Sequence, residues 1–482
     1  MSALELSDYV YGSVPFASAA AGLAWRQWAP TSFWYAVGFP VCAVRTYGTW
    51  HNVAFGCGLT KRRRAVRWSL DGVPGFDSAG RMRQRRRLRK VDVDKAPRLG
   101  MMRPTRVGFT VTLRLVDGQT PETVTAALPA LAHAWRCHSV RVLSWTPGKV
   151  TIVATDADPL TDVPLPQLAD GLLRVRIGNL ETGEPWVVDF RQVPHWFVAG
   201  ATNSGKSTWL NALILGLAAQ LADGSKLPER FDPAAVRGRG VALVGLDLKG
   251  GVEFTPYEMR MSKLATERDQ CGDLLEDLVL MVRLRMGLCR HFKTRNIWHE
   301  RIPDKLRPTP IVVLVDEVAE LFLMADKSQK DEVARVSTLL LRIAQIARAF
   351  GIYLVVCGQR MGSDLGPGVT ALRSQLTGRV CHRVNDDATA EMTLGDLDKG
   401  ATVAVRSIPP DMPGVAVAVG ADGRWRRARS AYITEEQAEA AAERYAVLTP
   451  SWEDLLTEVP PYAEQLPELD ELDAFDAEES RS

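Results

Sequence analysis

The sequence predicts an α/β protein in which helices cover a parallel sheet, preceded by a small α+β domain and an apolar N-terminal segment. Between residues 161 and 430, short apolar runs typical of buried strands alternate with helix-length patterns, as in parallel sheets. Residues 106–160 read as strand, helix, strand and strand, which is typical of a small α+β module. Residues 10–44 carry a single charge, at Arg26.

Composition places the chain among ordinary globular proteins. It has 482 residues, 46% of them hydrophobic and 24% charged, which suits two or three domains. Its seven scattered cysteines form no Cys-x-x-Cys, which argues against a disulfide framework or a zinc site and fits a reducing cytosol. The net charge of +2 conceals a basic stretch at residues 61–106 and an acidic end after Trp452. Ends of opposite charge suggest different partners.

The N-terminal part, residues 1–60, contains two uncharged runs, residues 10–25 and 27–44. Each is shorter than the roughly 20 residues that cross a bilayer comfortably. A basic cluster at residues 61–67 follows them, and positive charge after an apolar segment favours the cytoplasmic side. We therefore expect a membrane anchor of one or two short spans or an interfacial segment. The alternative is a buried helical hairpin in a soluble protein.

Residues 61–105 read as a basic linker, because Gly72-Val-Pro-Gly75 interrupts a run rich in arginine. Such a linker can bind nucleic acid phosphates or anionic headgroups, or it can be solvated without a specific partner. The small domain follows at residues 106–160. Its expected elements are a strand at 107–115, a helix at 121–135 and two strands, 139–145 and 150–154, joined by Pro147-Gly-Lys149.

A complete phosphate-binding loop, Gly200-x-x-x-x-Gly205-Lys206-Ser207, lies between an apolar strand and a helical pattern. Its glycines allow several backbone N–H groups to face one anion, and the helix N-terminus adds its positive end. Lys206 is expected on the β/γ-phosphates of ATP, Ser207 on Mg²⁺ and Thr208 on the α-phosphate. A glycine-rich turn with an exposed lysine is the simpler alternative. The expected nucleotide-binding residues are Gly200, Ala201, Thr202, Asn203, Ser204, Gly205, Lys206, Ser207 and Thr208.

Two carboxylates end a second apolar strand, Ile311-Val-Val-Leu-Val-Asp-Glu317. Asp316 fits the metal-holding acid of a P-loop enzyme, beside Ser207. Glu317 can orient or deprotonate a water that attacks the γ-phosphate. A structural reading makes the pair the N-cap of a helix over residues 318–324. Both readings are compatible with the sequence.

The other elements of the region 161–430 place further polar residues at strand ends. The pattern gives strands at 241–246 and 352–356, separated by helical patterns at 262–291 and 331–349. Because ligands bind at the carboxyl ends of parallel strands, Gln359 is a candidate γ-phosphate sensor. Its alternative role is an amide that caps a turn.

Several ordered blocks around the loop resemble the FtsK/SpoIIIE family of DNA-pumping ATPases, and most closely its actinobacterial conjugal plasmid transfer proteins. The resemblance covers residues 108–413 and implies a RecA-like motor that forms a hexameric ring around double-stranded DNA. It also implies attachment to the cell membrane with the ATPase domain in the cytoplasm. The blocks are Gly183-Glu-Pro-Trp-Val-Val-Asp189, Val193-Pro-His195, Arg295-Asn-Ile297, Leu314-Val-Asp-Glu-Val-Ala-Glu320, Ala347-Arg-Ala-Phe-Gly-Ile352 and Gly358-Gln-Arg360.

The resemblance also makes Arg348, rather than Arg379, the candidate for an arginine finger that acts on a neighbour's nucleotide. A salt bridge on a helix surface is its alternative role. We expect His195 to have a packing or backbone-bonding role, and a loop at residues 360–372 with Arg360 and Arg373 at its ends to contact DNA in the pore.

The last part of the chain departs from the family. Residues 431–482 contain one helical pattern, then Pro450, Pro460 and Pro461 and an acidic tail. This segment is too short for the winged helix that relatives use to read DNA sequence. The expected function is ATP-driven DNA translocation, with conjugal transfer of a plasmid or integrative element favoured. Alternatives are a chromosome-segregation pump, a protein-secretion ATPase and a regulator that binds nucleotide and DNA without translocating.

Overall fold

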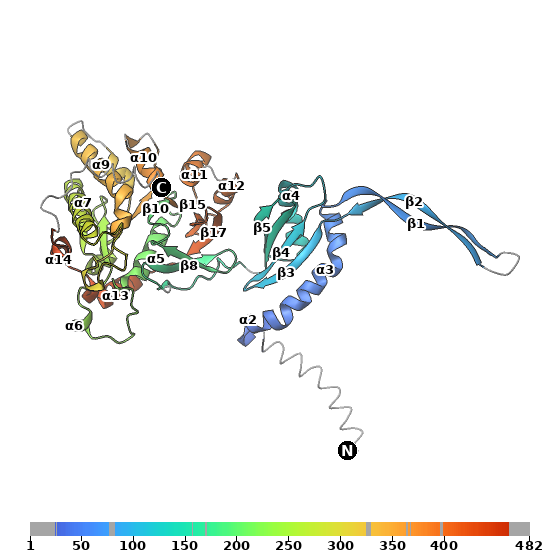
Figure 1. The fold of residues 1–482 in the computed structure, drawn as a ribbon, viewed down its shortest axis with the longest axis horizontal. Helices are drawn as coiled ribbons and strands as arrows, with labels where there is room; N and C mark the ends of the chain where they lie inside the picture. Colours follow the sequence, from blue (N-terminus) through green and yellow to red (C-terminus); the bar gives the residue numbers. More distant parts are fainter. Residues whose placement is uncertain are drawn as a thin grey trace, which may run out of the picture. The chain divides into compact units, whose positions relative to one another are not determined.

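A computed structural model describes residues 25 and 27–461, except for 77–81, 157, 169–170, 324–328, 363–364, 367 and 396–398 (Figure 1). The first uncharged run and residues 462–482 of the acidic tail therefore lie outside the described residues, apart from Trp25. The chain divides into two compact units. The first contains residues 1–159 with 182–184, and the second contains residues 160–181 with 185–482.

The first unit is built on a four-stranded antiparallel sheet in the order β3-β4-β6-β5. Helix α4 (Pro121–Trp135) matches the predicted bounds, because Thr120 forms a capping box at its start and Arg136 ends it in the left-handed conformation. The strand β3 lies in the stretch predicted as a linker. The strands are β3 (Arg98–Thr105), β4 (Gly108–Arg114), β5 (Ser139–Thr146) and β6 (Lys149–Thr155).

Helix α3 (Phe39–Gly56) packs on this small sheet, after α2 (Pro30–Phe33) and a π-helical turn (Trp34–Gly38). Trp50 is buried in the core of the unit, and its indole N–H donates to the Pro97 carbonyl over 2.6 Å. The opposite side of the helix exposes Val41 and Val44. In the part of the chain that the structure describes, no helix has both the length and the apolar character to cross a bilayer.

Residues predicted as a basic linker form a long antiparallel ribbon instead. Strands β1 (Lys61–Phe76) and β2 (Met82–Lys95) pair from Lys61 opposite Lys95 to Phe76 opposite Met82, with an irregularity between Asp71 and Gly75. The linker prediction was based on the glycines and the proline of residues 72–75, which are residue types depleted in strands. In the structure, pairing between the two strands supplies their backbone hydrogen-bond partners.

The second unit contains an 11-stranded mixed sheet within its described residues. The prediction of a parallel sheet is right for one half, in the order β12-β11-β13-β14-β10-β15, and wrong for the other, where β16, β17, β8 and β7 pair antiparallel and β9 pairs with β8. Short turns such as that at Gly423, with φ of 67°, permit antiparallel but not parallel neighbours.

The strands of this sheet have the following bounds. The parallel half contains β10 (His195–Ala199), β11 (Ala242–Leu246), β12 (Lys263–Ala265), β13 (Ile311–Val315), β14 (Ile352–Gly358) and β15 (Gly378–His382). The antiparallel half contains β7 (Gln167–Leu168), β8 (Arg174–Leu180), β9 (Pro185–Asp189), β16 (Val415–Val419) and β17 (Trp425–Ser430).

Helices cover both faces of the parallel half, which explains its uninterrupted apolar strands. In β13, residues 311, 313 and 315 belong to the core under α7 (Arg268–His291) and α9 (Lys330–Ile346). Residues 312 and 314 belong to the core under α5 (Lys206–Ala218) and α13 (Glu435–Tyr445). Because alternate residues face opposite sides, a strand buried on both sides shows no polar alternation.

Residues 431–461 pack on the second unit instead of forming a separate domain. Thr434 caps α13, and the Trp452 indole N–H in α14 (Trp452–Thr457) donates to Asp277 over 2.9 Å. Glu458 then accepts from the Thr309 backbone N–H at 2.8 Å. The remaining short helices are α6 (Pro233–Val236), α8 (Val318–Phe322), α10 (Val369–Gln375), α11 (Asp387–Leu394) and α12 (Lys399–Arg406).

Candidate nucleotide site

The phosphate loop joins the carboxyl end of β10 to the start of α5, and its glycines are required by space. Gly205 has φ of 109°, and a Cβ there would lie 2.0 Å from the Gly414 nitrogen. A Cβ on Gly200 would lie 2.3 Å from the Ser204 hydroxyl. The backbone of Ser204 also accepts from the Gly414 N–H over 3.1 Å. The first N–H groups of α5 have no partner within the helix, so the loop is a ready anion site.

The structure brings the loop and the two acids of β13 together. Lys206 Nζ lies 3.2 Å from Glu317 Oε2, and Lys249 Nζ lies 2.7 Å from Asp316 Oδ2. The two carboxylates are only 6% and 7% exposed, so each requires a nearby cation. Glu317 occupies the N-cap position of α8 but makes no side-chain cap bond. The acids therefore serve the lysines of the site and not the helix that follows.

Glu317 is held at both oxygens. Oε2 pairs with Lys206, while Oε1 accepts the backbone N–H of Gln359 over 3.2 Å. Gln359 directly follows β14 and is exposed there. A carboxylate fixed in this way has a defined direction, which a base that acts on one water molecule requires.

Three functional candidates escaped the sequence analysis: Asp247, Lys249 and Glu253, all in the loop after β11. Asp247 is fully buried and accepts the backbone N–H groups of Lys249 and Glu253 over 3.0 and 2.9 Å. Burial raises the pKa of Glu253, opposed by a hydrogen bond from Ser207. The pKa of Lys249 is raised overall. Partial burial acts to lower this pKa, but the hydrogen bond to Asp316 and the charge of that carboxylate outweigh the effect of burial. The sequence does contain a signal for these residues, because an acid and a lysine follow directly after an expected parallel strand, where ligands bind.

The oxygen donors of this site fit Mg²⁺. Ser207 offers a hydroxyl and Asp316 a carboxylate, and Glu253 interacts with both of these residues. Mg²⁺ is commonly held by one or two carboxylates together with phosphate oxygens and waters. Ser207 and Asp316 would hold the ion, which would neutralise charge on the β- and γ-phosphates.

Arg348 is not part of this cluster. It lies just before β14, at the amino edge of the sheet, whereas the phosphate loop lies at the carboxyl edge. At about 3.3 Å per residue, the seven residues of β14 separate the two edges by roughly 20 Å. In the described part of the chain Arg348 has no ion pair, so the surface salt bridge considered from the sequence is not seen. Arg379 donates to the Arg373 carbonyl, and burial lowers its pKa to about 10.

The pairing of Lys249 with Asp316 generates a stability prediction. Lys249→Met removes a half-exposed cation from a buried carboxylate, so we expect a loss of about 1–2 kcal/mol, less than for a fully buried pair. For a unit of this size, Tm should fall by about 2–4 °C in thermal unfolding without nucleotide. Lys263→Met, an exposed lysine on β12, is the matched control. Equal Tm values for the two variants would contradict the role assigned to Lys249.

Comparison with known proteins identifies both parts of the chain. Residues 20–156 match the actinomycete conjugal transfer protein N-terminal domain, and residues 163–363 match the FtsK/SpoIIIE family. The two matches meet near residue 160, where the two structural units also meet.

Individual relatives agree with this assignment. The chain is 39% identical over 368 residues to the transfer protein TraSA of Streptomyces ambofaciens, which covers 74% of this chain and 84% of that protein. It is 42% identical over 275 residues to a sporulation regulatory protein of Streptomyces azureus, covering 57% and 82%. The DNA translocase FtsK of Halalkalibacterium halodurans is 27% identical over 356 residues, covering 68% of this chain but 41% of that longer protein. The chain therefore belongs to the FtsK/SpoIIIE family, among the actinomycete conjugal transfer proteins.

Proposed function

We propose that the protein is an ATP-driven translocase that moves double-stranded DNA in conjugal transfer between cells. The observation that carries the proposal is the meeting of Lys206, Glu317, Lys249 and Asp316 at one sheet edge. It occurs in a chain whose other unit matches a conjugal transfer domain. Relatives named as a transfer protein and as DNA translocases support the same function.

The geometry supports a simple division of roles in hydrolysis. Lys206 binds the β/γ-phosphates, and the backbone of residues 200–205 and the start of α5 surrounds them. When Lys206 turns to the phosphates, Glu317 keeps the Gln359 N–H and Lys249 Nζ, which lies 3.9 Å from its Oε2, so it can orient the attacking water. The Gln359 side chain, at the same strand end, is proposed to sense the γ-phosphate.

Arg348 enters this scheme only through a neighbouring subunit. Because roughly 20 Å of sheet separates it from its own phosphate loop, it can stabilise transition-state charge only in a second copy's site. We therefore propose a hexameric ring, as the resemblance to the FtsK/SpoIIIE family implies. In this ring Arg348 would be the arginine finger that acts on the nucleotide of a neighbouring subunit.

The basic ribbon is proposed as a second DNA contact outside the pore. Its register pairs Arg67 with Arg89, Ser69 with Arg87 and Asp71 with Arg85. The register thus brings arginines of the two strands to paired positions, and the sequence of β2 adds further arginines between them. An isolated two-stranded ribbon is only marginally stable in water. The major groove of duplex DNA is wide enough to admit such a ribbon. DNA would therefore stabilise the ribbon that binds it.

Contacts within the pore are proposed for residues 360–372, which follow β14 at the nucleotide edge. Arg373 also donates to the Met361 carbonyl over 3.0 Å, so its substitution would disturb the loop as well as DNA binding. Arg360 is exposed and is the cleaner position for a test of coupling.

Membrane association through residues 10–44, with the ATPase unit on the cytoplasmic side, is also part of the proposal. Its support is the exposed apolar surface of Trp28, Val41 and Val44, which are 88%, 64% and 74% exposed. A deletion of residues 1–60 would be a poor test, because it would remove Trp50, Ala54 and Leu59 from the core of the small domain.

The roles of Lys206 and Glu317 predict two different defects. Lys206→Ala should abolish ATP binding, because the ammonium is needed in the ground state, whereas Glu317→Gln should bind ATP and hydrolyse it about 10²–10⁴-fold more slowly. Fluorescent-nucleotide titration and phosphate release measure the two effects. Near-parental hydrolysis by Glu317→Gln would show that another group is the base.

The same assay tests the finger. Arg348→Ala alone should be slow, and mixing it with Glu317→Gln should restore part of the activity, because one of the two kinds of mixed interface combines an intact base with an intact arginine. Each variant incubated with more of itself is the control. Failure of the mixture would reject a finger that acts between subunits.

The ribbon predicts a salt-dependent effect on DNA binding. Arg87→Gln with Arg89→Gln should weaken duplex binding and reduce the slope of log affinity against log salt by about 2. DNA-stimulated hydrolysis should persist at saturating DNA. Arg230→Gln with Arg237→Gln, two exposed arginines of the second unit, should leave the slope unchanged.

The translocase function itself is tested with the parent protein on triplex DNA. Duplex DNA should stimulate hydrolysis, and ATP should drive displacement of the third strand. If neither occurs, the proposal fails and a static nucleotide-dependent regulator takes its place. Stimulation by polypeptide instead of DNA would favour a secretion ATPase.

Membrane association predicts a change of fraction upon cell lysis. Combined Trp28→Ser, Val41→Ser and Val44→Ser should move a large part of the protein from the membrane fraction to the soluble one, because apolar burial contributes about 25 cal/mol per Å². Val252→Ser, another exposed apolar residue, is the control. If the parent protein is soluble without detergent, the membrane anchor is rejected. Packing of α3 on the small sheet would then be the only role of this segment.

A further inference from the structure

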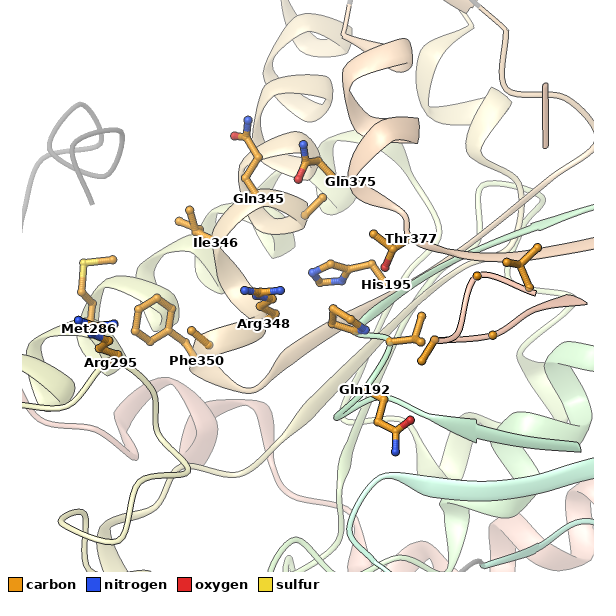
Figure 2. A pocket seen from close by; sticks show the side chains of 18 residues that line it. Gln192, His195, Met286, Arg295, Gln345, Ile346, Arg348, Phe350, Gln375 and Thr377 are labelled. Atoms are coloured by element: carbon orange, nitrogen blue, oxygen red, sulfur yellow. The ribbon is translucent and has the colours of Figure 1, made fainter. Parts of the chain in front are cut away.

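A cavity of about 760 Å³ lies at the amino ends of β10 and β14, at the sheet edge opposite the phosphate loop (Figure 2). Its walls combine buried apolar side chains with polar ones, including Gln345 and Gln375. Its volume is that of a typical ligand site. The buried apolar lining residues are Val193, Met286, Ala344, Ile346, Phe350 and Val419.

The cavity carries positive charge without a compensating acid. Arg295 and Arg348 line it, and no carboxylate is among the lining residues. In the described part of the chain, neither arginine side chain has an ion pair or a hydrogen bond. Two guanidinium groups at a half-apolar cavity favour an anionic occupant with apolar groups of its own.

His195 adds a donor to the same cavity. Its Nδ1 accepts the Leu354 backbone N–H over 3.1 Å, so the proton of the neutral ring is assigned to Nε2. That nitrogen is buried, on a residue only 1% exposed, and has no hydrogen-bond partner among the residues that the structure describes. Burial lowers the pKa of His195 to about 3, with a smaller effect of the Arg348 charge. The ring is therefore a neutral donor that lacks an acceptor.

The chain itself carries an anion of suitable chemistry, the acidic tail (residues 462–482). Its sequence alternates apolar and acidic residues as Leu466-Pro-Glu-Leu-Asp-Glu-Leu-Asp-Ala-Phe-Asp476, a pattern that suits a surface both apolar and cationic. Neither the nucleotide site nor the proposed DNA contacts use this segment.

The last described residues lead to the cavity. Glu458 Oε2 lies 3.5 Å from Arg285 Nη2, and Arg285 Nη1 donates to the Phe350 carbonyl over 2.8 Å. Phe350 and the next residue of α7, Met286, both line the cavity. Glu458, four residues before the tail, thus lies within two contacts of the cavity wall, and the 21 residues of the tail are long enough to reach the cavity from there at about 3.3 Å each.

We propose that the acidic tail docks in this cavity of its own chain. Its carboxylates would pair with Arg295 and Arg348, one of them accepting from His195 Nε2, and its leucine or phenylalanine side chains would contact Ile346 and Phe350. Docking covers Arg348, so it withholds the finger from a neighbour and represses hydrolysis, a consequence that rests on the proposed function.

Photo-crosslinking of the full-length protein tests the docking. With p-benzoylphenylalanine at position 475, irradiation followed by peptide mass spectrometry should join the tail to peptides that contain residues 192–195 or 344–350. Arg295→Gln with Arg348→Gln should reduce this product at least about fivefold, as should 1 M salt, where the Debye length is only about 3 Å. Arg230→Gln with Arg237→Gln should leave it unchanged.

Other results would overturn the proposal. Crosslinks to the basic ribbon β1–β2, or spread evenly over the surface, would show that the tail lies elsewhere. Crosslinks between isotopically labelled and unlabelled chains would assign the tail to a neighbour's cavity and reject docking within the chain. The crosslinking experiment uses no nucleotide or DNA. The docking can therefore be rejected while the translocase function holds, and the docking can be confirmed while the translocase function is rejected.

The regulatory consequence has its own measurement. Asp470→Asn, Glu471→Gln and Asp473→Asn together should lower the crosslink yield and raise basal ATP hydrolysis about two- to fivefold, as expected for a contact of about 0.4–1 kcal/mol. Lower crosslinking with unchanged hydrolysis would retain the docking and reject repression.

Discussion

The functional part of this protein depends on the pairing of two buried carboxylates with lysines from two different loops. Asp316 and Glu317 end a strand that is buried on both faces, and isolated charges there would be too costly to keep. Lys206 and Lys249 relieve that cost, and in doing so they fix the phosphate loop and the loop after β11 against the end of β13. The same pairs hold the loops in position and supply the charges that a nucleotide would rearrange.

Local patterns predicted much of this arrangement. The apolar runs of β10 and β13 and the glycine spacing of the loop are determined by residues close in sequence, and α4 begins and ends at the predicted residues. Prediction failed where the cause is non-local. Lys249 and Glu253 matter because β11 lies beside β13, and the arginine-rich ribbon forms because its two strands pair with each other.

The two edges of the parallel sheet have opposite character. The carboxyl edge gathers Asp247, Glu253, Asp316 and Glu317, whereas the amino edge presents Arg295 and Arg348 around a cavity without acids. A ring built head to tail uses two different surfaces of each subunit. Because Lys206 and Lys249 already pair with the buried Glu317 and Asp316 of the carboxyl edge, the two arginines of the amino edge carry the charge that remains for other partners.

The positive charge of the amino edge explains why an acidic tail would bind there. A finger arginine must be exposed and unpaired within its own subunit, because a strong partner there would compete with the neighbour's phosphates. Such a cation at an apolar cavity also attracts any flexible anion at high effective concentration, and a tethered acidic segment has that property. The local contact therefore needs to be only weak to hold the arginine in an isolated subunit. Nucleotide phosphates of a neighbour, carrying more charge in a drier site, can then displace it during assembly.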